Sequence, residues 1–85
     1  MFIINLNKVE SARKVSDMEK GEKAIITGFL DEQLSTKLLE MGFIPGTSIQ
    51  LNFTAPLGDP LCVTVSGYDL SIRKDEAATI LIRNG

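Results

Sequence analysis

The chain has 85 residues, of which 44% are apolar and 24% charged, and its formal net charge is −2. This length supports one small domain, and the slightly acidic balance argues against a nucleic-acid binder, because such proteins usually carry a basic face. No apolar run reaches the ~20 residues that cross a bilayer, and the start MFIINL lacks the features of a secretory signal. We therefore expect a soluble cytoplasmic domain.

The residue types that are missing exclude most enzyme chemistry. The chain has no histidine, and Cys62 is its single cysteine. Without an imidazole, the usual general base, the commonest metal ligand and the usual activator of a cysteine nucleophile are absent. No G-x-x-x-x-G-K-[ST] loop is present to hold nucleotide phosphates. We expect a protein that is not an enzyme and that uses no cofactor.

The N-terminal part is predicted to be an extension followed by one helical turn. Residues 1–14 begin with apolar, β-branched residues and then turn polar, which is typical either of a short strand over 2–7 or of a loose tail. Such a strand could add to a neighbour's sheet and make a homodimer through residues 1–7. Ser16 and Glu19 fit a capping box that would begin the helical turn.

Residues 31–43, DEQLSTKLLEMGF, are predicted to form the main helix, after a strand over 23–29. Gly28 in that strand marks either a bulge or a close approach of another backbone. The apolar side chains of the helix recur with helical spacing and make one stripe. Asp31 or Ser35 can cap the start of this helix, and Gly42 suits its left-handed end. Packing on a core is the usual role of such a stripe, although a helix of this length could leave part of it open to a partner.

The second half of the chain predicts strands that alternate between apolar and polar residues. A turn over 44–47 comes first, and in SIQLNFT the side chains of Ile49, Leu51 and Phe53 share the inward face. Cys62 is expected to point outward from the next strand. The alternating segments that follow are LCVTVSG, YDLSIR and ATILIR, with KDEA as a polar corner before the last. Five short strands with one helix predict a small, mainly-β, closed or nearly closed barrel.

The loop APLGDP, between two of these strands, is predicted to be a rigid corner. Pro56 and Pro60 restrict φ and withhold amide donors, Gly58 permits unusual backbone angles, and Asp59 can bond to nearby amides. Leu57 is either tucked over the end of the barrel or held toward a partner. A rigid loop loses little entropy on binding, which makes it a candidate for partner binding.

Two other surfaces are alternative candidates for binding the partner. Leu34 and Leu38 lie on the helix stripe, and Arg73 could receive an acidic patch. The adjacent carboxylates at 31–32 and 75–76 are interpreted as solvated or capping groups, because neighbouring side chains point apart. Ferrous sites favour imidazole together with carboxylate, so no metal site is predicted from these residues.

An ordered set of motifs runs from Leu38 to the end of the chain. The helix ends in LLEMGF, and IPGTSI, APLGDP, VSGYDLSIR and EAATI follow it. In this order and spacing the motifs closely resemble the FeoA family of bacterial ferrous iron transport accessory proteins. The resemblance covers roughly residues 15–83, which we therefore expect to be the FeoA-like domain.

The resemblance implies a small SH3-like β-barrel of five or six short strands with one inserted amphipathic helix. It also implies a non-catalytic cytoplasmic accessory protein whose partner is the membrane ferrous iron transporter with its cytosolic GTP-binding domain. Contact with the membrane would then be indirect, through the transporter, and nucleic acid would not be a ligand. The alternative hypothesis is a metal-sensing or iron-chaperone domain that binds a transition metal ion directly.

Overall fold

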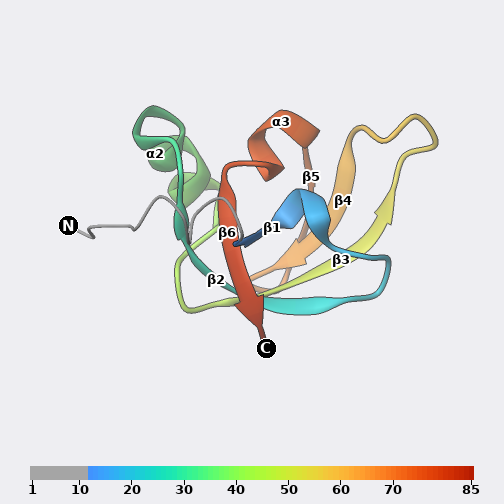
Figure 1. Ribbon diagram of the computed structural model, residues 1–85, viewed down its shortest axis with the longest axis horizontal. Coiled ribbons are helices and arrows are strands. Elements are labelled where there is room, and N and C mark those ends of the chain that lie inside the picture. Colours follow the sequence, from blue (N-terminus) through green and yellow to red (C-terminus); the bar gives the residue numbers. More distant parts are fainter. Residues whose placement is uncertain (1–11) are drawn as a thin grey trace.

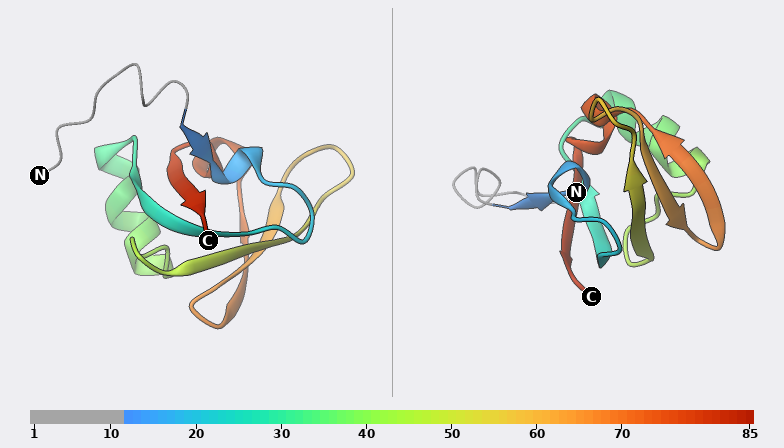
Figure 2. Two further views of the ribbon diagram at one scale, coloured as in Figure 1. Left: turned by 60° about the horizontal axis from the view of Figure 1, so that its bottom comes forward. Right: turned by 90° about the vertical axis from the view of Figure 1, so that its right-hand side faces the viewer.

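The computed structural model describes residues 12–85, which form a single six-stranded antiparallel sheet in the order β1-β6-β2-β3-β4-β5 (Figure 1). The sheet curls so that β1 and β5, its two ends, lie on opposite sides of the molecule (Figure 2). The strands are β1 (Arg13–Lys14), β2 (Lys23–Phe29), β3 (Ser48–Thr54), β4 (Leu61–Val65), β5 (Tyr68–Ile72) and β6 (Ile80–Asn84). The mainly-β fold is confirmed. The strand predicted over residues 2–7 lies outside the described residues.

Three helical segments lie between the strands in the chain. They are the 3-10 turn η1 (Val15–Asp17), the helix α2 (Glu32–Met41) inserted between β2 and β3, and the short helix α3 (Lys74–Ala77) between β5 and β6. In the described part of the chain, none of the helices has both the length and the apolar character needed to span a membrane.

The core is built from the inward-facing side chains of β2, β3 and β4. Ile26, Ile49 and Val63 are completely buried, and Leu51 and Val65 are almost so. Burying an aliphatic side chain of this size stabilises the fold by about 1.5–3 kcal/mol. The polar residues between them stay at the surface, as period-2 alternation requires.

Two bulges interrupt this alternation. The register of β2 against β6 shifts between Ile26 and Gly28, so the structure shows the bulge, one of the two roles predicted for Gly28. A second shift, between Leu51 and Phe53, places one extra residue in β3 opposite β4. An extra residue reverses the faces of the side chains that follow it. The prediction that Phe53 faces the core is therefore wrong, and its side chain is 50% exposed.

Helix α2 begins and ends as predicted. Asp31 Oδ1 accepts hydrogen bonds from the backbone N–H groups of Gln33 and Leu34, and Gly42 closes the helix with φ of 110°. These bonds satisfy orphan amides of the first turn. Leu38 is completely buried, whereas its neighbour Leu39 is 43% exposed. The hypothesis that Leu38 contacts a partner is wrong, because its side chain is part of the core.

The predicted capping box at Ser16 and Glu19 does not form. Asp17 instead accepts a hydrogen bond of 2.9 Å from the backbone N–H of Lys14, and this bond closes the 3-10 turn. The N–H of Glu19 donates to the carboxylate of Glu22 at 2.9 Å. Glu22 competes successfully for this amide because its carboxylate is held in place by the guanidinium of Arg13.

The segment KDEA, predicted to be a polar corner, forms α3 and buries Glu76. Only 9% of this residue is exposed, and its carboxylate accepts a hydrogen bond of 2.6 Å from Nζ of Lys37 on α2. The Lys37 hydrogen bond lowers the pKa of the Glu76 carboxyl and outweighs the opposing effect of burial. The interpretation of Glu76 as a solvated group is therefore wrong: it joins α3 to α2.

Substitution of the two neighbouring leucines of α2 separates core packing from surface exposure. We expect Leu38→Ala to lower the free energy of unfolding by about 2–5 kcal/mol, since it leaves a cavity. Leu39→Ala, the matched control, should change it much less, because Leu39 is exposed and is not part of the core. Chemical denaturation measures both, and equal losses would contradict the assigned orientation of α2.

The Arg13–Glu22 ion pair predicts an acid-dependent loss of stability. The guanidinium hydrogen bond, followed by the Glu19 amide, lowers the pKa of Glu22 from its ordinary 4.5 to about 2. The stabilisation is therefore present above pH 4.5 and is lost as the pH falls from there toward 2. We expect the melting temperature of Glu22→Gln to fall less steeply over this interval than that of the wild type. Parallel melting curves would argue against the pair.

Candidate docking site

The loop that joins β3 to β4, residues 55–60, has a well-defined conformation. The N–H of Ala55 donates to the carbonyl of Pro60 at 3.0 Å, and the N–H of Gly58 donates to the carbonyl of Ala55 at 2.8 Å. Gly58 has φ of 90°, which an L side chain rarely adopts, and the Asp59–Pro60 peptide bond is cis. These hydrogen bonds hold the loop as a compact tip at the end of the β3–β4 hairpin.

Asp59 connects this tip to α3. Its Oδ1 accepts a hydrogen bond of 3.0 Å from the backbone N–H of Lys74, the first residue of the helix. That N–H has no acceptor within the helix, so the carboxylate satisfies it, as the sequence predicts for Asp59. Arg73 immediately precedes the helix, and both Arg73 and Lys74 are exposed. The hydrogen bond therefore brings two cationic side chains to the base of the loop.

Two apolar side chains of this hairpin face solvent. Leu57 is 97% exposed at the tip, and Phe53 is 50% exposed at the base, on the far side of the bulge. Of the two orientations considered for Leu57, the structure shows the one in which it is held away from the barrel. Exposed apolar side chains on a rigid element are typical of protein-binding surfaces. Phe53, Leu57 and the loop between them form what we call the hairpin arm.

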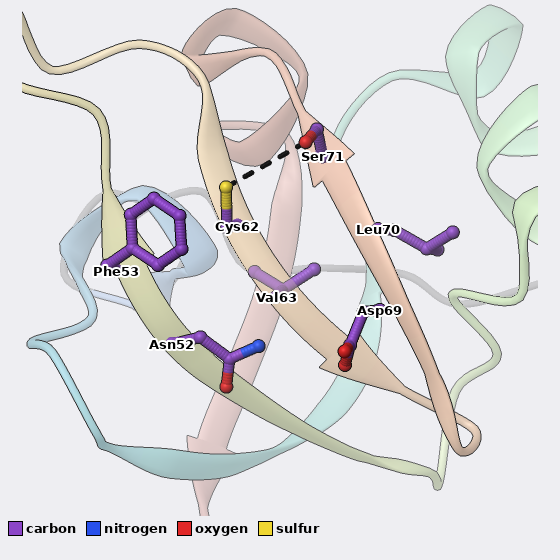
Figure 3. A pocket seen from close by; sticks show the side chains of 7 residues that line it. All are labelled: Asn52, Phe53, Cys62, Val63, Asp69, Leu70 and Ser71. Carbon is purple, nitrogen blue, oxygen red and sulfur yellow. Dashed lines mark hydrogen bonds between the residues drawn. The ribbon is translucent and has the colours of Figure 1, made fainter.

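A shallow hollow of about 250 Å³ lies beside Phe53 on the outer face of the sheet (Figure 3). Its lining residues come from β3, β4 and β5: Asn52, Phe53, Cys62, Val63, Asp69, Leu70 and Ser71. Cys62 points outward between the buried side chains of Leu61 and Val63, as predicted. Its sulfur lies 3.8 Å from the hydroxyl oxygen of Ser71.

Two of the lining residues, Asn52 and Asp69, are connected by hydrogen bonds through Thr64. Asn52 Nδ2 donates to Thr64 Oγ1 at 2.8 Å, and this hydroxyl donates to Asp69 Oδ1 at 2.6 Å. The hollow thus offers amide, hydroxyl and carboxylate groups with one aromatic wall. Such a surface can accommodate a polar side chain of a partner next to the apolar hairpin arm.

The predicted partner-binding residues divide into two groups. Pro56, Leu57, Gly58, Asp59 and Pro60 lie together on the hairpin arm, with Arg73 at its base. Leu34 and Leu38 lie on α2, at the other side of the molecule from this loop (Figure 1). Leu34 is partly buried and packs against the core, in the same direction as Leu38.

Within residues 12–85, no three His, Cys, Asp or Glu side chains are grouped closely enough to hold a metal ion. The carboxylates with lowered pKa values, Glu22 and Glu76, are each paired with a cationic side chain. The ion pairs are the main cause of the lowered pKa of each carboxyl group.

Residues 13–84 match the family model of the FeoA domain. The chain belongs to the FeoA family. It is also 34% identical, over 68 residues, to the Fe(2+) transport protein A/Fe(2+) transporter FeoB fusion protein of Porphyromonas gingivalis. That match covers 79% of this chain but only 8% of the fusion protein, so the chain corresponds to a small part of its length.

Solved structures show the same fold. A FeoA-like protein from Clostridium acetobutylicum is 34% identical with a TM-score of 0.81, and the match covers 86% of each chain. FeoA of Stenotrophomonas maltophilia, solved with zinc and described as a prokaryotic SH3 domain protein, has a TM-score of 0.74 at 23% identity, covering 85% of this chain and 91% of that one. The predicted SH3-like barrel is confirmed.

Sequence reasoning missed Phe53 and the hollow beside it. Strict alternation placed Phe53 in the core, and nothing in SIQLNFT marks the extra residue. The signal that could have indicated a break is the short polar side chain of Asn52 before the aromatic ring, since Asn is depleted in regular strands.

The bond between the loop and α3 can be tested with matched variants of Asp59. We expect Asp59→Ala to lower the free energy of unfolding by about 1 kcal/mol, because the Lys74 amide loses its acceptor. Asp59→Asn keeps an acceptor oxygen and should retain most of the stability. Hydrogen exchange of the Lys74 amide should accelerate in the alanine variant alone, and equal exchange in all three proteins would contradict the bond.

Proposed function

We propose that this chain is a non-enzymatic cytoplasmic accessory protein that binds the cytosolic GTP-binding region of a membrane ferrous iron transporter and modulates transport. The observation that carries the proposal is the FeoA family membership, together with a relative named as a fusion with the transporter FeoB. Fusion in one polypeptide keeps two domains at high effective concentration, which suits partners that act by direct contact. Binding between separate chains would preserve the same contact.

The hairpin arm is the surface we assign to this contact. Leu57 protrudes from a loop whose conformation is set by hydrogen bonds within the loop and to α3. A partner that buries Leu57 gains apolar contact without ordering a flexible segment, so little of the gain is lost to entropy. Phe53 extends the apolar surface, and the exposed Arg73 and Lys74 favour a partner surface with acidic residues nearby.

Titration of the purified transporter region with this protein tests the proposal, with and without guanine nucleotide. We expect Leu57→Asp to weaken binding by about tenfold or more, because an anchor worth about 1.5–3 kcal/mol is replaced by a charge. The matched control is Leu39→Asp, which replaces an exposed leucine of α2, and this variant should bind as the wild type does. Circular dichroism establishes that both variants fold.

The outcomes distinguish the function from the surface. If the wild-type protein does not bind the transporter region at high micromolar concentration, the proposed function is wrong. If Leu57→Asp binds as tightly as the wild type while Leu39→Asp binds weakly, the function stands and the contact lies on α2. Anaerobic calorimetry with Fe²⁺ tests the alternative of direct metal binding, which tight one-to-one binding would favour.

A further inference from the structure

β5 forms one end of the sheet, and its outer edge is open. In the described residues it pairs with β4 only. The two-residue turn between these strands has φ of 51° at Ser66 and 83° at Gly67, typical of a type I′ turn. Such a turn makes Val65 and Tyr68, the residues on either side of it, a hydrogen-bonded pair.

The pairing pattern determines which backbone groups of β5 face outward. Hydrogen-bonded and non-hydrogen-bonded pairs alternate along an antiparallel ladder, so Asp69 and Ser71 fall in non-hydrogen-bonded pairs with Thr64 and Cys62. Their N–H and C=O groups therefore point away from β4. No hydrogen bond within residues 12–85 reaches these groups. They are the donors and acceptors to which another strand can be added.

The two faces beside this edge differ in polarity. On the inner face, Leu70 is partly buried against the core and Tyr68 is 71% exposed. On the outer face, Asp69 and Ser71 are exposed and line the polar hollow. A strand that fits here must be apolar on one side and polar on the other.

The first residues of the chain come near to this pattern. In FIINLN, residues 2–7, Phe2, Ile4 and Leu6 would share one face of a strand, and the other face would carry Asn5 and Asn7 together with one apolar residue, Ile3. The segment contains no charge and no proline, and β-branched residues favour extended conformation. Residues 8–11, which connect it to the described part, can span about 14 Å when extended.

We propose that residues 2–7 of a second copy of this chain add as a strand to the open edge of β5, so that two copies exchange these segments. Phe2, Ile4 and Leu6 pack on Leu70 and Tyr68, and Asn5 and Asn7 lie beside Asp69 and Ser71. The receiving edge belongs to a second copy because the segment leads into β1, at the opposite end of the sheet (Figure 2). A two-fold exchange of this kind is a closed, symmetric dimer.

Light scattering of the full chain and matched variants tests this proposal. We expect the wild type to be a dimer at high micromolar concentration and the variant lacking residues 2–7 to be a monomer. Ile4→Asn alters the apolar face and should raise the dimer dissociation constant by about tenfold or more. Ile3→Asn, on the other face, should leave it nearly unchanged.

Substitution on β5, the strand that would receive the added segment, provides an independent test. Ser71→Pro removes an outward N–H without breaking a bond inside the monomer, because proline is tolerated on the open side of an edge strand. It should abolish dimerisation, whereas Ser71→Ala keeps the N–H and should dimerise as the wild type does. Circular dichroism confirms folding, and the Asp69 and Ser71 amides should gain protection from hydrogen exchange as the wild-type concentration rises.

Three results would overturn the proposal. A wild-type protein that stays monomeric at high micromolar concentration excludes the exchange. A folded Ser71→Pro variant that still dimerises excludes this edge. Protection of the Asp69 and Ser71 amides in a monomer would show that the same chain covers its own edge. The proposal does not depend on the transporter, since all measurements use this protein alone.

Discussion

Burial of the inward-facing aliphatic side chains of β2, β3 and β4 is the interaction on which the rest of the structure depends. A chain of 85 residues supports only one such core, and Ile26, Ile49 and Val63 lie at its centre with no exposed surface. The helices take their orientation from this core: α2 turns Leu38 inward, and α3 buries Glu76 against Lys37 of α2. Because almost every large aliphatic side chain of the sheet is used in this way, surfaces for partners are left to bulges, turns and the ends of the sheet.

The hairpin arm illustrates how an irregularity in a strand produces such a surface. The extra residue between Leu51 and Phe53 turns the aromatic ring outward, and the loop beyond it holds Leu57 in solvent. Leaving these side chains in solvent costs hydrophobic stabilisation. Exposed apolar patches in natural proteins commonly mark surfaces that bind a partner. The Asp59 hydrogen bond to α3 then limits the motion of the loop. This geometry is compatible with the proposed contact to a transporter, because binding of a partner needs a surface of defined shape.

The open edge of β5 is a different kind of surface from the hairpin arm. It offers backbone donors and acceptors at Asp69 and Ser71, whereas the arm offers side chains. The hollow lies between them and is lined by residues of both. Leu57, at the tip of the loop, is not among the residues of the β5 edge or of the hollow. Natural proteins rarely leave a sheet edge unprotected, which is a physical reason for a chain to cover it with a segment of its own sequence.

The sequence by itself determined the features that depend on neighbouring residues. It predicted the Asp31 cap, the Gly42 helix end and the mainly-β pattern, and the motifs identified the family. Only the tertiary structure decided which side of a predicted element meets the core. The apolar stripe of α2 did not show that Leu38 is buried while Leu39 is exposed, because that depends on the rotation of the helix against the sheet. Likewise Glu76 is paired with Lys37, 39 positions away in the sequence. A local sequence pattern cannot predict this contact, because the two residues meet only when the chain folds.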